Sequence, residues 1–181
     1  MADTNKIQKQ LGLLLLNGAI NNLRAAYKVT NPTVVGFGKI TDLAREAFPN
    51  IGVSHKDTSF MLAPKQTWIN FFNELVLDRM DYYADAFDCD NFAFLSSSFS
   101  SLFLLLNSCG VAHCTAYRKD TGELVSGHYL NLITTSDDGV YLFDLNNRNN
   151  FDNFGYVKVV KGVDPFIGNW IYRAVDRVEF Y

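Results

Sequence analysis

The spacing of apolar residues changes at Gly110, and this change limits the chain to a small group of folds. Before it, apolar residues recur every three or four positions, as they do along a helix that is buried on one side. After it, apolar and polar residues alternate, as they do in strands whose two faces meet different surroundings. Because helices come first and strands afterwards, the sequence predicts an α+β protein with an antiparallel sheet.

Helices are expected before Gly110, where the apolar residues keep a helical period. Proline and glycine residues between them predict irregular connections over residues 29–40 and 49–65. The fourth helix is apolar on nearly every side, which is typical of a helix in the centre of a domain. Gly110 is placed to end that helix. The predicted helices span residues 4–28, 41–48, 65–84 and 89–107.

Five strands are expected after Gly110, joined by turns rich in glycine, asparagine and aspartate. We expect an N-terminal helical segment, residues 1–65, and a core, residues 66–181, which together form one compact unit. In that core, the fourth helix would pack on the antiparallel sheet. The predicted strands span residues 111–118, 124–135, 140–145, 156–161 and 171–180.

Composition argues against several classes of function. The chain has 181 residues, of which 48% are hydrophobic, and this is enough for one domain with a sizeable core. Its net charge of -3 and its lack of a basic run do not favour nucleic-acid binding. The three cysteines contain no CxxC pair, which predicts neither a disulfide framework nor a zinc site. We therefore expect no metal and no other cofactor.

The cysteine at position 89 stands where the fourth helix is expected to begin. Asp88 can cap that helix, and Cys89 then lies in the first helical turn. Unpaired N–H groups and the positive end of the helix dipole favour the thiolate, which is the form that attacks. A buried structural cysteine is the alternative, because free cysteines are among the most buried residues.

A nucleophilic cysteine needs a base and a group that orients the base, and strand parity suggests candidates for both. A three-residue turn after Ser136 would pair this residue with Val140, and Asp144 would then lie on the same face as His128. The helix of Cys89 would have to pack on that face. A hydrogen-bonded core histidine and a turn-capping acid are the alternatives. The three histidines of the chain are His55, His113 and His128.

Four segments together resemble the transglutaminase-like core, which shares the papain-like arrangement. In that family a cysteine begins a helix, a glycine-containing turn leads into a strand, a histidine begins the next strand, and an aspartate ends the one after it. The order Cys89, His128, Asp144 is the order of the family. The segments that carry the resemblance are Phe87–Ala93, Cys109–Ala112, Gly127–Leu132 and Gly139–Asp144.

The resemblance implies a cysteine-dependent hydrolase or acyltransferase that acts on amide bonds of a peptide or protein substrate. Cys89 would attack the carbonyl carbon, His128 would act as base and then as acid, and Asp144 would hold the imidazole. A papain-style arrangement would use Asn146 in place of Asp144. The implied chemistry requires no cofactor.

A catalytically inactive papain-like fold is the second hypothesis, because the sequence departs from the family pattern. Leu130 takes the place of the usual aromatic residue, and Ala112 and His113 replace a proline and an arginine. Such a chain would serve as a binding or structural subunit of a larger assembly, such as a phage particle. Its N-terminal helices would then contact a protein partner.

A short apolar run, Leu11–Leu16, follows Lys6 and Lys9 near the N-terminus. Asparagines follow the run and no A-x-A cleavage site is evident, so we expect a helix rather than a signal peptide. No stretch reaches the roughly 18 unbroken apolar residues that a membrane span needs, and no membrane partner is expected. The expected location is the cytoplasm or a phage assembly.

Overall fold

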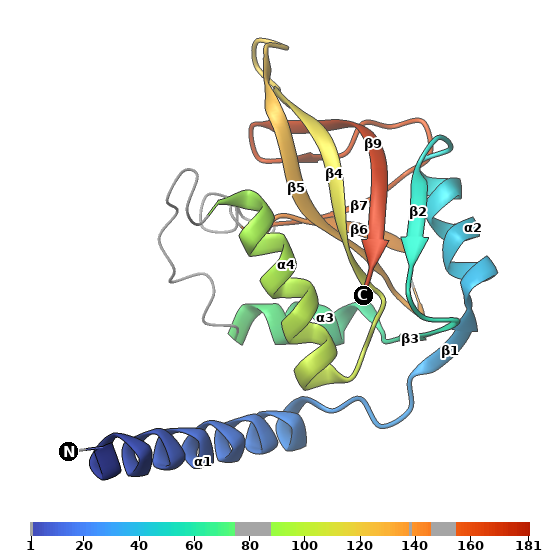
Figure 1. Cartoon of the computed structure of the whole chain (residues 1–181). Helices are drawn as coiled ribbons and strands as arrows, with labels where there is room; N and C mark the ends of the chain where they lie inside the picture. Colours follow the sequence, from blue (N-terminus) through green and yellow to red (C-terminus); the bar gives the residue numbers. More distant parts are fainter. Residues whose placement is uncertain (1, 75–87, 138, 146–154) are drawn as a thin grey trace.

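A computed structural model describes residues 2–74, 88–137, 139–145 and 155–181 (Figure 1). Helices occupy most of the first hundred residues, and the long strands follow, so the α+β class predicted from the sequence is confirmed. In chain order the elements are α1 (Ala2–Tyr27), β1 (Thr33–Gly36), α2 (Phe37–Ala47), β2 (Gly52–His55), β3 (Ser59–Leu62), α3 (Lys65–Glu74), α4 (Cys89–Phe99), the π-helical turn η2 (Ser100–Leu104), β4 (Cys109–Arg118), β5 (Leu124–Thr134), β6 (Val140–Phe143), β7 (Tyr156–Lys158), β8 (Phe166–Ile167) and β9 (Trp170–Phe180).

The main sheet has seven strands, in the order β2-β9-β4-β5-β6-β7, with β8 paired to β9. All of its pairs are antiparallel except the pair of β2 with β9, which is parallel. A separate two-stranded sheet joins β1 to β3. β2 comes from the predicted N-terminal segment, yet it forms the edge of a sheet whose other strands come from the predicted core.

The main sheet lies between two hydrophobic clusters, and β5 contributes alternate residues to them. Leu130 and Leu132 pack with Ile40 and Ala44 of α2, in what we call the α2-side cluster. Ile133 packs in the α4-side cluster. That cluster also holds Trp68, Phe71 and Phe72 of α3 and Phe92 of α4. This alternation is the period of two that the sequence shows after Gly110.

The short strands β1, β2 and β3 lie where the sequence predicts irregular connections. Each has four residues, which is too few for alternation to stand out from the surrounding sequence. In β3 the alternation is nevertheless present, since Phe60 and Leu62 are buried while Ser59 and Met61 are exposed. Residues 75–84 of the predicted third helix lie outside the described residues.

The helix that begins at Cys89 ends earlier than predicted, and a leucine ends it. After α4 and η2 the chain turns at Leu105, whose φ of 59° is in the left-handed region. Gly110 instead lies inside β4, where an added Cβ would come 2.6 Å from Cγ2 of Val178. Gly110 therefore allows β4 to pack closely against β9, and it does not end the helix.

Among the helices of the described part of the chain, none is both long enough and apolar enough to span a bilayer.

Candidate functional site

Cys89 is the first residue of α4, as the sequence predicts. Asp88 and Asn91 form a capping box, in which the backbone N–H of Asp88 donates to Oδ1 of Asn91 at 3.2 Å. Oδ1 of Asp90 accepts the backbone N–H of Asn91 at 2.7 Å. Both acids beside the thiol thus interact with N–H groups of the first helical turn, and Cys89 itself is half-buried.

His128 and Asp144 are in direct contact. Nε2 of His128 lies 2.8 Å from Oδ2 of Asp144, and the carboxylate is almost completely buried. The strand register explains the contact. Thr134 pairs with Val140, two residues away from the pairing predicted for Val140, and a shift of two leaves every side chain on its predicted face.

Tyr172 completes this arrangement, and the sequence analysis missed it. Its hydroxyl donates to Oδ2 of Asp144 at 2.7 Å, and its ring stacks on His128 with the ring centroids 5.8 Å apart. Tyr172 is fully buried in β9. A buried tyrosine needs a hydrogen-bond partner for its hydroxyl, and this requirement is the one signal in the sequence that could have drawn attention to it.

The thiol of Cys89 reaches the imidazole of His128. Burial of His128 lowers its pKa, but the charge and hydrogen bond of Asp144 and the hydrogen bond and charge of Cys89 outweigh burial and raise the pKa to about 10. Because Nε2 of His128 contacts Asp144, Nδ1 is the ring nitrogen left for the thiol. The structure therefore brings Cys89, His128 and Asp144 together in that order.

The route by which Cys89 reaches His128 differs from the one predicted. α4 packs on the opposite face of the sheet, where the side-chain amide of Asn131 donates to the carbonyl oxygens of Ala93 at 2.9 Å and Gly110 at 3.3 Å. β6 pairs with β5 only over residues 131–134. His128 lies beyond the last of these pairs, on a part of β5 that β6 does not pair with.

The other two cysteines have different surroundings. Cys109 and Cys114 are buried, and burial raises the pKa of Cys109 to about 12. Burial, followed by the charges of Asp144 and Cys89, raises the pKa of Cys114 further. Both thiols are thus held in the protonated form, which is a poor nucleophile.

The remaining candidates have other partners or lie outside the described residues. His55 stacks on Phe37, with the ring centroids 3.4 Å apart. Nδ1 of His113 lies 2.9 Å from Oδ1 of Asp176. Asn146, the alternative third member of the site, lies outside the described residues. Within the described part of the chain, no three side chains of His, Cys, Asp or Glu form a group that could hold a metal ion.

Comparison with known proteins gives similarity to solved structures alone. No protein-family model and no curated protein matches the chain. A complex of PSL1a with E64 is similar over 81% of this chain and 50% of its own, with 14% identity and a TM-score of 0.53. A Polyporus squamosus lectin bound to a human-type influenza-binding epitope is similar over 62% of this chain and 42% of its own, with 14% identity and a TM-score of 0.46. The chain thus spans about half the length of PSL1a, and at this identity the likeness concerns the fold.

The likeness to PSL1a overturns the family assignment made from the sequence. No family model supports a transglutaminase-like or papain-like cysteine hydrolase. The same finding corrects three further predictions. They are the hydrolysis or transfer at amide bonds, the peptide or protein substrate, and the alternative of an inactive papain-like subunit. The physical reason is that the resemblance depended on short motifs over about a third of the chain, and such motifs occur in more than one family.

Proposed function

We propose that this chain carries a nucleophilic thiol site that binds an electrophilic small molecule covalently, by addition. In this proposal Cys89 forms the bond, His128 holds the proton of the thiol and Asp144 orients the imidazole. The observation that carries the proposal is the contact of one half-buried thiol with an imidazole that is itself held by a buried carboxylate. This nucleophile, base and orienting group are the parts that an activated thiol requires.

The chemistry is an addition in which no group leaves the ligand. The sulfur of Cys89 forms a bond to an electrophilic carbon, and the electron pair of the bond that opens in the ligand moves to a neighbouring atom. That atom takes the proton from the imidazolium of His128. Asp144 and Tyr172 support the charged imidazolium before this step, because the carboxylate contacts Nε2 and the hydroxyl contacts the carboxylate.

The first prediction concerns selectivity among the three thiols. N-ethylmaleimide, an activated alkene, is expected to modify Cys89 completely before Cys109 or Cys114 is detectably modified in the folded protein. The reason is that the other two thiols are buried and their pKa values are raised. Peptide mass spectrometry after a time course of labelling measures the order.

The control for this experiment is the Cys89→Ala variant, which should show no rapid phase of labelling. Unfolding the wild-type protein in guanidinium should make all three thiols react at similar rates. Equal and slow labelling of the three thiols in the folded protein would rule out the proposed site.

Glycan binding is a second candidate, and a row of side chains on the sheet favours it. His113, Tyr129 and Arg177 are register partners on three neighbouring strands, β4, β5 and β9. The guanidinium of Arg177 lies over the ring of Tyr129 and hydrogen-bonds its hydroxyl. Aromatic faces stack on sugar rings, and arginine donors bind sugar carboxylates in a bidentate way. Among the described residues, Arg177 forms no ion pair with a carboxylate, so its charge is available to an acidic glycan.

The second prediction tests this row against a matched arginine. Replacing Arg177 with alanine is expected to weaken binding of an acidic oligosaccharide by about tenfold or more, as for the loss of a hydrogen bond from a charged group. Arg173 is the control, because it also lies over a tyrosine, Tyr117, but is already paired with Asp164 at 2.6 Å. Arg173→Ala should leave the affinity unchanged. Calorimetric titration measures both variants. If the two variants bind with equal affinity, the row of His113, Tyr129 and Arg177 does not bind the glycan.

A further inference from the structure

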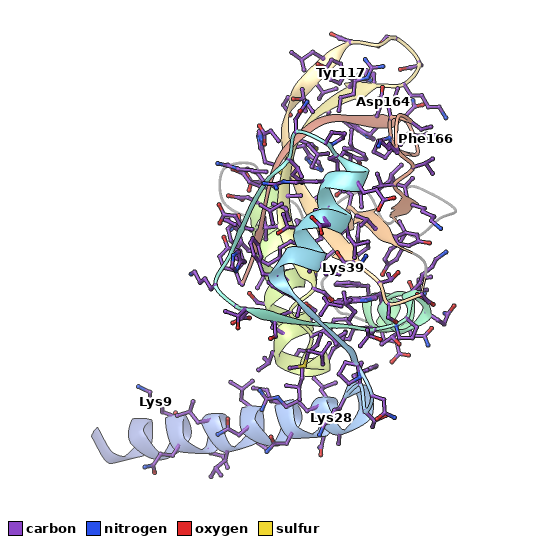
Figure 2. The ribbon with its side chains drawn as sticks, turned by 90° about the vertical axis from the view of Figure 1, so that its right-hand side faces the viewer. Lys9, Lys28, Lys39, Tyr117, Asp164 and Phe166 are labelled. Carbon is purple, nitrogen blue, oxygen red and sulfur yellow. The ribbon has the colours of Figure 1, made fainter. Side chains whose placement is uncertain are left out.

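We propose that two copies of this chain associate through the outer face of α1, with the two helices antiparallel and Gly18 at the crossing point. This proposal does not depend on the thiol site. It starts from a long helix that the rest of the chain covers on one side and near one end. Figure 1 shows α1 extending beyond the rest of the structure, and Figure 2 shows Lys9 on the part that extends.

The inner face of α1 is attached to the body of the protein. Ile20 and Tyr27 pack against the α4-side cluster, and the ring of Tyr27 meets Phe71 edge-on with the centroids 5.7 Å apart. Nε of Arg24 donates to the carbonyl oxygen of Leu102 at 2.7 Å. At about 100° per residue, these three residues of α1 share one side of the helix.

The outer face lies on the opposite side of the helix and is apolar over residues 11–15. Leu11, Leu14 and Leu15 expose 57%, 69% and 68% of their surface. Single exposed leucines are common in soluble proteins, but a contiguous group of this kind marks a contact surface. Neither Lys9 nor Arg24 lies on this face, so a contact made there would be uncharged.

The second half of the outer face is made of small or short side chains. It continues from the leucines through Gly18, Asn22 and Ala25, all of which are exposed. A Cβ added at Gly18 would meet nothing within 4 Å, so the backbone of the helix is open to close approach at this point. Large residues in the first half and small residues in the second half make the face complementary to a reversed copy of itself.

An antiparallel pair centred on Gly18 uses this complementarity. Leu14 of each copy then lies against Asn22 of its partner, and Leu11 lies against Ala25. A parallel pair would place leucine on leucine at one end and leave a gap between glycines and alanines at the other. A twofold axis repeats each contact, which is the usual arrangement of a homodimer. The body of each copy stays clear, because it is attached to the inner face.

The experiment measures the mass of the full chain in solution by light scattering after size-exclusion chromatography. At about 50 µM protein in the eluted peak we expect a mean mass about 1.7 times the monomer mass of 20.4 kDa, falling on dilution, for a dissociation constant on the order of 10 µM because a single helix pair is a small interface. The double variant L14Q/L15Q should return to 20.4 kDa with an unchanged circular dichroism spectrum, since glutamine keeps the helix propensity of leucine. The matched control is L124Q, which changes a leucine that is 58% exposed on β5 and should stay dimeric.

A cross-link distinguishes the antiparallel pair from other arrangements. Under mild oxidation by oxidised glutathione, G18C should give a covalent dimer on a non-reducing gel, whereas G12C, which lies off the outer face, should not. Wild-type protein run in parallel corrects for the native cysteines. A wild-type monomer at about 50 µM overturns the proposal. A larger oligomer in which G18C does not cross-link, or a monomer that floats with phosphatidylcholine vesicles, also overturns it.

Discussion

Replacing His128 with alanine is expected to slow the modification of Cys89 by N-ethylmaleimide about 100-fold at pH 7, the lower end of what a positioned base contributes. The ring of His128 hydrogen-bonds Cys89, and Asp144 holds it through Nε2 at 2.8 Å. Without the imidazole, no base among the described residues lies beside the thiol. The rate constant for modification, followed by intact-protein mass spectrometry, gives the effect directly.

His113→Ala is the matched control for that experiment. His113 is also a strand histidine with a carboxylate partner, since its Nδ1 lies 2.9 Å from Oδ1 of Asp176. Its removal should leave the modification rate of Cys89 unchanged. If both variants react at the wild-type rate, Cys89 is not activated by His128.

Replacing Asp144 with asparagine is expected to lower the free energy of unfolding by about 3–5 kcal/mol at pH 7, the range for breaking a buried ion pair. Asp144 accepts hydrogen bonds from both His128 and Tyr172, and it is 1% exposed. The asparagine keeps the shape but removes the charge, so the buried imidazolium loses its counterion. Urea denaturation followed by circular dichroism measures the change.

Asp176→Asn supplies the comparison, because this carboxylate also pairs with a histidine but is exposed. The exposed pair with His113 should contribute no more than about 1 kcal/mol. Equal losses of stability in the two variants would show that the pair of His128 with Asp144 is no stronger than a surface pair.

The same pair makes the stability of the protein depend on pH. The pKa of His128 is raised from 6.5 to about 10 in the folded state, so folding favours the protonated imidazole. Its contribution is therefore fully present below about pH 6.5 and is lost as the pH rises toward 10. The free energy of unfolding should fall across this window in the wild-type protein and much less steeply in Asp144→Asn.

The sequence predicted that His128 and Asp144 lie on the same face of the sheet, and this prediction tolerates an even-numbered error in strand register. The predicted pairing of Val140 was wrong by two residues, yet a shift of two leaves both side chains on one face. An error of one residue would have separated them. The prediction of Cys89 at a helix start depended on local capping by Asp88, which acts within one turn.

Features that depend on distant parts of the chain could not be predicted in this way. Tyr172 contacts a carboxylate 28 residues earlier in the sequence, and no local pattern encodes that contact. The packing of α4 on the face opposite His128 likewise follows from how the whole sheet is covered. β2 pairs in parallel with β9, which lies more than a hundred residues later in the chain. A strand of four residues is too short for its sequence pattern to predict this pairing.

The family assignment failed for a related reason. Motifs of a few residues were read in the order of one superfamily, and order alone does not separate families that place a cysteine, a histidine and an acid along a chain. The contacts among Cys89, His128 and Asp144 therefore do not identify the family of the chain. The family was tested by comparison with known proteins.

The side chain of Asn131 has a consequence for how the thiol and the imidazole move. Its two amide donors join α4 to β4, but among the described residues its Oδ1 has no hydrogen-bond partner. An unpaired buried acceptor costs about 1–3 kcal/mol, so an apolar residue here would give a more stable core. Asn131 lies three residues from His128 on β5, and it binds the carbonyl of Ala93, four residues from Cys89 on α4. The helix cannot slide along the sheet without breaking this bond. The bond therefore fixes the sulfur of Cys89 relative to the ring of His128, at a cost in the free energy of folding.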